Sequence, residues 1–180
     1  MPHFFFPTPV PFTAYHASKL FGEHLVRIAN RKKPTGATLR LTSPVGPGMP
    51  ENRILSVFAK QALTGRPIQL AGQGSRRQDY VDVRDIAYAV ELCLKGRVKG
   101  LYNIAGGTSI SNRELAETCV RVLNSSSPIE FSGAPDPEEG IIWDVSIAKA
   151  SRQFGYEPQH GIEQSISACV AASTKDVISQ

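Results

Sequence analysis

The chain has 180 residues, of which 41% are hydrophobic and 20% are charged, a balance typical of globular proteins that bury one core. No apolar run reaches the roughly 20 residues needed to span a bilayer. The opening from Met1 to Pro7 has neither the basic region nor the long apolar region of a secretory signal, so a cytoplasmic protein without membrane contact is expected. The net charge of +4 comes without a long basic stripe interleaved with aromatics. We therefore expect no nucleic-acid partner and favour a small anionic ligand.

The first third of the chain alternates between helix and strand patterns. Thr13 is a candidate N-cap for a helix that runs to about Arg31, where Lys32-Lys33-Pro34 stops it. A short strand is expected at 37–42, followed by a loop rich in Gly and Pro at 43–48. A helix that leads at once into a strand and such a loop predicts an α/β layer with ligands at the carboxyl end of the strand.

The remaining residues continue the α/β pattern. Helices are expected at 54–63, from Asp85 to before Gly96, and at 146–154 and 161–172. A further helix is expected to begin at a capping box, Ser111–Glu114, and to run to Leu123. Strands are expected at 67–70, 78–83 and 101–104. The three cysteines, Cys93, Cys119 and Cys169, are far apart and lie in apolar helical patterns. They predict buried thiols rather than a disulfide, and we expect no metal site.

A tyrosine and a lysine lie four residues apart in Tyr15-His16-Ala17-Ser18-Lys19, near the start of the first expected helix. At that spacing both side chains rise from one helical face. A neighbouring ammonium group favours the phenolate form of a tyrosine, which a general base near neutral pH requires. The pattern also occurs on ordinary helices, so by itself it leaves a structural role open.

Further motifs follow this pair in a recognisable order. They are Glu23, the strand and Gly-Pro loop from Arg40 to Gly48, and then Gly65-Arg66-Pro67-Ile68, Gly72-Gln73-Gly74-Ser75, Asp79 to Ala87, Tyr102 to Gly107 and Phe154 to Pro158. In this order they resemble the C-terminal half of the extended short-chain dehydrogenase/reductases, the NAD-dependent epimerase/dehydratase family. Each motif is weak, but several in the same order across nearly the whole chain are jointly specific.

The resemblance implies that Tyr15 is the catalytic acid/base, and that Lys19 assists it and binds the nicotinamide ribose of NAD or NADP. It places Ser43 near the nicotinamide or the substrate, although a serine before a proline is also an ordinary turn residue. The substrate class it implies is a nucleotide-sugar. Epimerase, dehydratase and reductase activities all stay open.

The resemblance also directs attention to the stretch Arg76-Arg77-Gln78. Many relatives carry an arginine at the position of Gln78, where it holds the diphosphate of the nucleotide sugar, and a neutral amide cannot make that charge-assisted contact. Adjacent residues of a strand face opposite sides, so Arg76 shares the side of Gln78 and is the better candidate for the anion. Surface arginines without a ligand are the alternative. Asp79, Asp82 and Asp85 are expected to be structural, with Asp85 as an N-cap or an early-turn acid.

The family's dinucleotide site begins with a Gly-x-x-Gly-x-x-Gly loop between a strand and a helix, and the sequence contains no such loop. The Gly pairs at 46 and 48, 72 and 74, and 106 and 107 are interpreted as turns. We therefore expect the chain to be a fragment that is inactive alone. Residues 1–50 are expected to be a remnant of the Rossmann domain. Residues 51–180 are expected to form a substrate-binding region of mixed α/β structure, interleaved with Rossmann elements. The alternatives are a non-catalytic nucleotide-sugar or anion-binding module and an interaction domain. Self-association through the first helix is expected.

Overall fold

The computed structural model describes residues 13–31 and 36–178, with side chains as far as residue 172. The elements are α1 (Ala14–Ala29), β1 (Ala37–Leu41), β2 (Ser43–Val45), α2 (Ile54–Leu63), β3 (Ile68–Leu70), β4 (Arg77–Asp82), α3 (Val83–Lys95), β5 (Gly100–Ile104), β6 (Ser109–Ser111), α4 (Asn112–Val122), β7 (Ile129–Phe131), α5 (Ala148–Phe154) and α6 (Ile162–Ile178). The predicted α/β class is confirmed. None of these helices combines the length and the apolar character needed to cross a bilayer.

Most strand pairs are parallel. β1 pairs with β5, β2 with β4, and β3 with β7, all in parallel, while β6 adds to β4 in antiparallel orientation. Parallel neighbours require crossover connections, which the intervening helices supply. Elements before and after residue 50 therefore share sheets, and the predicted division of the chain into 1–50 and 51–180 stays a prediction.

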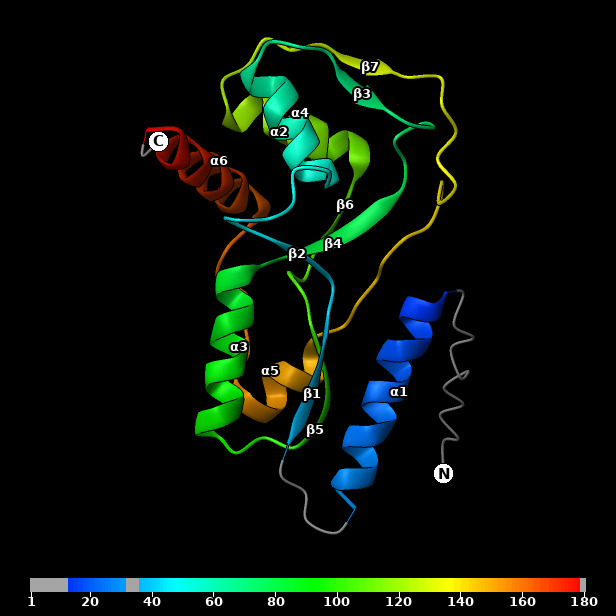
Figure 1. Cartoon of the computed structure of the whole chain (residues 1–180), viewed down its shortest axis with the longest axis vertical. Helices are drawn as coiled ribbons and strands as arrows, with labels where there is room; N and C mark the ends of the chain where they lie inside the picture. Colours follow the sequence, from blue (N-terminus) through cyan, green and yellow to red (C-terminus); the bar gives the residue numbers. More distant parts are fainter. Residues whose placement is uncertain (1–12, 32–35, 179–180) are drawn as a thin grey trace.

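Two apolar clusters hold these elements together. The first joins α2, α4 and α6 to β3 through side chains such as Leu55, Ile68 and Leu115, all fully buried. The second packs α3 and α5 against β1 and β5 around Tyr102 and Tyr156. In Figure 1 the helices that carry the first cluster and those that carry the second lie at opposite ends of the molecule, with β2, β4 and β6 between them. This middle region is where the candidate binding residues lie.

Helix starts follow the local sequence. The Thr13 hydroxyl accepts a hydrogen bond from His16 N at 3.2 Å and begins α1 as predicted. The predicted capping box at α4 is confirmed, because the Ser111 hydroxyl accepts from Glu114 N while the Glu114 carboxylate accepts from Ser111 N. Each cap satisfies backbone groups that a helix end leaves without partners.

Three expectations need correction. Residues 43–45, expected to be loop, form β2, since Pro44 lies at the edge of its sheet, where its missing N–H costs no ladder bond. Helix α3 begins at Val83, with Asp82 as its N-cap, rather than at Asp85; Asp85 lies in the first turn, which confirms the early-turn alternative. Strands β6 and β7 were not expected, because three residues carry too little pattern.

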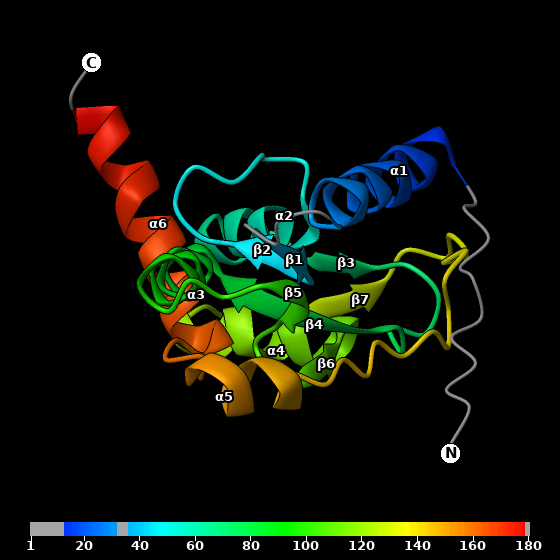
Figure 2. The same cartoon turned by 90° about the horizontal axis from the view of Figure 1, so that it is seen from below.

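Helix α1 lies beside β1 at the outside of the molecule (Figures 1 and 2), and none of its residues is buried. Phe21, Leu25 and Ile28 are 63%, 50% and 57% exposed. At the opposite side, the C-terminal end of α6 points away from the other helices (Figure 2). The exposed side chains of α1 form an apolar face that the described part of the chain does not cover. The Phe4-Phe5-Phe6 segment lies outside the described residues.

Candidate functional site

Tyr15 and Lys19 lie on one face of α1, as their spacing predicts. The Lys19 ammonium lies over the tyrosine ring, with Nζ 5.1 Å from the ring centroid. Tyr15 is 65% exposed. Among the interactions of the described residues, this ring contact is the one that engages Lys19 Nζ. The phenol and the ammonium are therefore adjacent and open to a ligand.

The position of α1 is fixed by two polar contacts with the region of β1. Arg40 of β1 donates from Nε and Nη2 to the two oxygens of Glu23, both at 2.7 Å. This bidentate bond to Glu23 raises the pKa of Arg40. At the other end, the Asn30 side chain bonds both the N–H and the carbonyl of Gly36. These contacts place the Tyr15 helix alongside the strand.

A buried aspartate ties three strands together at their ends. Asp79 is 2% exposed, and its Oδ1 accepts from Thr42 Oγ1 and from Gly106 N, both at 2.7 Å. A Cβ at Gly106 would overlap the carbonyl of Tyr80, so this crossing admits only glycine. Asp79 is therefore structural, as predicted.

Ser43, Gln78 and Arg76 form one polar row along β2 and β4. The Ser43 hydroxyl is 3.5 Å from the terminal amide of the buried Gln78. The amide orientation that satisfies both neighbours has its oxygen accepting from Arg76 Nε at 2.7 Å and its nitrogen donating to the Tyr80 hydroxyl at 3.2 Å. Burial raises the pKa of Tyr80 to about 12, with the charge of Arg76 acting in the opposite direction. Arg76 also forms an ion pair with Glu138.

Arg77 faces the other side of β4. Its guanidinium donates to the Ser109 carbonyl at 2.6 Å and pairs with Glu114 at 3.0 Å. The alternation expected along the strand therefore separates Arg77 from Gln78 and keeps Arg76 with it. Within the described residues, no hydrogen bond or ion pair joins either Tyr15 or Lys19 to this polar row.

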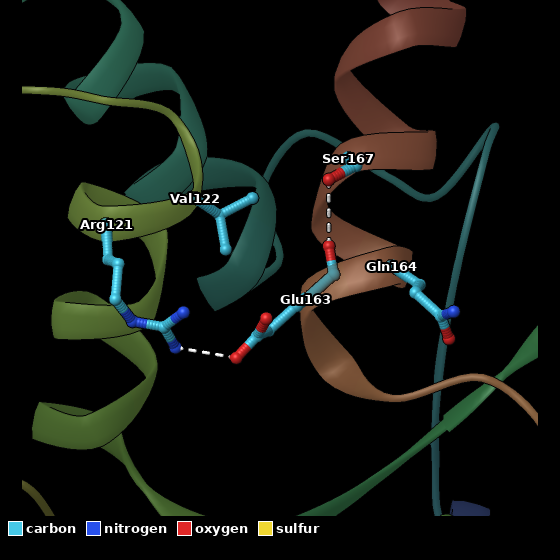
Figure 3. Close-up of a pocket in the computed structure, with 5 residues that line it drawn as sticks. All are labelled: Arg121, Val122, Glu163, Gln164 and Ser167. Carbon is cyan, nitrogen blue, oxygen red and sulfur yellow. Dashed lines mark hydrogen bonds and ion pairs between the residues drawn. The ribbon is translucent and has the colours of Figure 1, made fainter.

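Two cavities are lined in part by residues of the first turns of α6. One, of about 550 Å³, is lined by Arg121, Val122, Glu163, Gln164 and Ser167 between α4 and α6 (Figure 3). It contains the ion pair between Arg121 and Glu163, at 2.7 Å. The other, of about 450 Å³, shares Glu163 and Gln164 and extends to Tyr80 and His160.

His160 is a polar residue of the second cavity that no sequence motif indicated. Its Nδ1 is 2.7 Å from Oδ1 of Asp85, and its backbone N–H donates to Oδ2 at 3.0 Å. Asp85 is 1% exposed. The two residues are 75 positions apart, so only the fold reveals the pair. The contact fixes the segment before α6 against the first turn of α3.

Asp82 makes a second link between α3 and α6. It accepts from Arg84 N, and Ser165 Oγ donates to its Oδ2 at 2.6 Å. Burial would raise the pKa of Asp82, but the hydrogen bonds from Arg84 and Ser165 outweigh it and lower the pKa to about 2. Both aspartates are structural, as predicted. No group of acidic, histidine or cysteine side chains in the described ranges is arranged to hold a metal ion.

Comparison with known proteins identifies the family. The model of the NAD dependent epimerase/dehydratase family matches residues 5–105, more than half of the 180 residues. The chain belongs to this family. The dTDP-glucose 4,6-dehydratase of Xanthomonas campestris is 29% identical over 172 residues, a match that covers 89% of this chain and 49% of the relative. The corresponding enzyme of Neisseria gonorrhoeae is 28% identical over 175 residues, covering 87% and 49%. The chain thus spans about half the length of the curated relatives it matches.

Solved structures support the same fold. A UDP-glucose 4-epimerase from Thermotoga maritima, determined with UDP-glucose, superimposes with a TM-score of 0.83 at 20% identity and covers 93% of this chain and 55% of its own. A UDP-glucose 4-epimerase from Thermus thermophilus, in complex with NAD, gives 0.78 at 25% identity, covering 91% and 55%. The predicted membership in the epimerase/dehydratase family and the Rossmann-type fold are confirmed.

Family membership raises the question of which residues of this chain fit NAD. A pyrophosphate site needs free backbone N–H groups at a glycine loop. A Cβ at Gly46 would overlap Val83, one at Gly106 would overlap Tyr80, and the turn at Gly72 encloses the carboxylate of Glu139. Gly46 and Gly106 thus serve as packing points, and Glu139 already occupies the N–H groups of the Gly72–Gly74 loop, so no glycine pair of the described ranges presents an open cradle for a dinucleotide. In the described residues, the groups available to bind a dinucleotide are isolated ones, such as the exposed ammonium of Lys19.

Proposed function

We propose that this chain carries the acid/base helix and the nucleotide-sugar-binding portion of an NAD-dependent sugar-nucleotide epimerase or dehydratase. The observation that carries the proposal is the polar row of Ser43, Gln78 and Arg76 at the junction of β2 and β4, in a chain whose relatives are dTDP-glucose dehydratases. The row ends in a guanidinium with 24% of its side chain exposed. A planar cation at the end of a fixed polar row suits a diphosphate.

In this proposal Tyr15 takes the proton from a sugar hydroxyl. Lys19, whose ammonium lies over the ring of Tyr15, binds the nicotinamide ribose. NAD, when bound, supplies the hydride acceptor for the sugar carbon. Ser43 is assigned to the nicotinamide or the adjoining part of the substrate. Glu23 and Arg40 keep the tyrosine helix at a fixed position beside β1.

Arg76 replaces the missing guanidinium at position 78. The Gln78 oxygen accepts from Arg76 Nε, which orients the guanidinium while leaving part of it exposed. Gln78 thus acts as a positioning residue for Arg76. Arg77, committed to Ser109 and Glu114, is left with a structural role.

A second candidate function is a nucleotide-sugar-binding module without redox chemistry. The observation that favours it is the packing at Gly46 and Gly106 and the occupation of the Gly72 loop by Glu139, which together leave no open cradle for a dinucleotide among the described residues. In this form the 180-residue polypeptide by itself binds the nucleotide sugar through Arg76 and does not turn it over.

Titration calorimetry tests the substrate class. UDP-glucose and dTDP-glucose are compared with glucose 1-phosphate and with the free nucleosides uridine and thymidine at one low salt concentration. The proposal predicts that at least one nucleotide sugar binds tenfold more tightly than any of the smaller compounds. Equal, weak binding of all of them would contradict it. Adding NAD to the best ligand and following conversion of the nucleotide sugar by chromatography separates the two candidate functions, because NAD is regenerated within each turnover.

A further inference from the structure

The segment from Ser132 to Trp143 lies against the β3–β4 loop as a strap, a name used below for these residues. At its start, Ser132 N donates to the Leu70 carbonyl and Gly72 N donates to the Ala134 carbonyl, both at 2.8 Å. Near its end, Arg77 N donates to the Ile141 carbonyl at 2.9 Å. In Figure 1 it is the yellow segment that runs from β7 down the side of the molecule toward α5. Backbone hydrogen bonds thus hold the strap on both sides of its acidic middle, Asp136 to Glu139.

The β3–β4 loop directs several donors at this acidic middle. Gln73 N donates to Glu139 Oε2 at 2.8 Å, Ser75 N donates to Oε1 at 3.1 Å, and the Ser75 hydroxyl donates to the same oxygen. Gly72 and Gly74 have φ angles of 56° and 67°, which turn the intervening N–H groups to one side. The bonds from Ser75 and Gln73 lower the pKa of Glu139. The loop is therefore built around a negatively charged oxygen pair.

Arg76 extends this donor set by one residue. Its guanidinium forms an ion pair with Glu138, the neighbour of Glu139. The N–H of Glu138 donates to Asp136 Oδ1 at 2.9 Å, and Glu139 N donates to the Asp136 carbonyl, so a turn presents both glutamates to the loop. Two adjacent carboxylates thus accept hydrogen bonds from two backbone amides and a hydroxyl and form an ion pair with a guanidinium. Two linked phosphoryl groups present the same chemistry, with more charge and more acceptor oxygens.

The carboxylates are held loosely enough to be exchanged. The side chain of Glu138 is 47% exposed and Glu139 is also exposed. The exposed ion pair of Glu138 with Arg76 contributes at most about 1 kcal/mol, and salt screens it. Glu139 is held by hydrogen bonds that a phosphoryl oxygen can accept in its place. A multiply charged anion can therefore take the place of a glutamate while the backbone bonds at both ends of the strap stay closed.

We propose that Gln73, Ser75 and Arg76 form a diphosphate site that Glu138 and Glu139 occupy as internal competitors. The strap sets the affinity of the site, since the ligand must displace two carboxylates of the chain itself. The inference rests on the proposed function in one respect, which is that the diphosphate belongs to a nucleotide sugar. Inorganic pyrophosphate carries the same phosphoryl oxygens as hydrogen-bond acceptors, without the nucleotide or the sugar.

Calorimetric titration of the full chain with inorganic pyrophosphate tests the proposal. The variant Glu138→Gln/Glu139→Gln keeps the shape of both side chains and removes their charge. The matched control, Glu117→Gln/Glu157→Gln, changes the net charge equally at two exposed sites away from the loop. We expect the strap variant to bind at least tenfold more tightly than both the wild type and the control. Adding Arg76→Gln to the strap variant should remove the gain.

Hydrogen exchange of the 72–77 segment gives a second readout that does not depend on affinity. The amides of Gln73 and Ser75 should exchange faster in the strap variant, because their acceptor Glu139 is weakened, and pyrophosphate should restore slow exchange. The proposal would be overturned if the wild type, the strap variant and the control bound pyrophosphate with affinities within twofold of one another. It would also be overturned if the gain in affinity of the strap variant remained after Arg76→Gln was added.

A parallel titration with UDP-glucose separates this inference from the proposed function. A similar gain for UDP-glucose in the strap variant supports both. A gain for pyrophosphate while no variant binds UDP-glucose supports the strap and refutes the nucleotide sugar. Tight, equal binding of UDP-glucose to the wild type and the strap variant refutes the strap alone.

Discussion

Removal of the Ser165 hydroxyl should destabilise the protein in a pH-dependent way. Ser165 Oγ donates to Asp82 Oδ2 at 2.6 Å, and both residues are 1% exposed. Ser165→Ala leaves a buried carboxylate with one donor fewer, at the point where α6 meets the N-cap of α3. A hydrogen bond to a charged group contributes about 1.5 to 3 kcal/mol.

The pKa of Asp82 sets the size and the direction of the pH effect. Its lowering from 3.8 to about 2 corresponds to roughly 2 kcal/mol for all the donors to this buried carboxylate together. Because the folded-state pKa lies below the unfolded value, this stability is present above about pH 4 and is lost as the pH falls toward about 2. Ser165 is one of several donors, so we assign it about 1 to 2 kcal/mol of the free energy of unfolding near neutral pH.

Urea unfolding of the wild type, Ser165→Ala and Ser167→Ala provides the assay. Ser167 lies on the same helix, but it is exposed and its hydroxyl only bonds the Glu163 carbonyl at 3.0 Å. We expect Ser167→Ala to change the free energy of unfolding by less than about 0.5 kcal/mol at every pH. The cost of Ser165→Ala should shrink by half or more between about pH 6 and about pH 2. An equal cost at both ends of this range, or equal costs for the two variants, would refute the reasoning.

Two further predictions concern ligands and association. The isolated 180-residue chain should bind NAD with a dissociation constant weaker than about 1 μM, because Lys19 offers one ribose contact, Gly46 and Gly106 are closed by packing and Glu139 occupies the Gly72 loop. Calorimetry that gives about 8 kcal/mol or more would contradict this. The chain should self-associate through α1, whose Phe21 and Leu25 are exposed. Sedimentation velocity over a concentration series should show that Phe21→Ser/Leu25→Ser reduces association, whereas Leu94→Ser, at a 74% exposed position of α3, leaves it unchanged. A wild-type monomer at all concentrations would exclude this surface.

Features with a local physical cause could be predicted from the sequence. Thr13 starts α1 and Ser111 with Glu114 starts α4, since a cap depends on residues within one turn. The placement of Arg76 and Arg77 on opposite sides followed from strand alternation alone. The Tyr15 and Lys19 contact followed from helical spacing.

Contacts between distant segments could not be predicted in this way. His160 meets Asp85 across 75 positions, and Glu139 meets Ser75 across 64, and neither pair leaves a periodic pattern. Strand β2 could not be predicted because Pro44 normally marks a loop, although a proline is tolerated at a sheet edge. The burial of Cys119 was predicted correctly, whereas Cys93 and Cys169 are only partly buried; none of the three forms a disulfide in the described part of the chain.

The most direct test of the account compares Arg76→Gln with Arg77→Gln in titrations with UDP-glucose and dTDP-glucose over a range of salt concentrations. Both variants lose one charge, but only Arg76 contacts the polar row of Ser43 and Gln78. We expect Arg76→Gln to weaken binding of the better ligand at least tenfold and to flatten its salt dependence. Arg77→Gln should change the affinity less than threefold. Equal and negligible effects of the two substitutions would contradict the assignment of Arg76 to the diphosphate and return both arginines to a structural role.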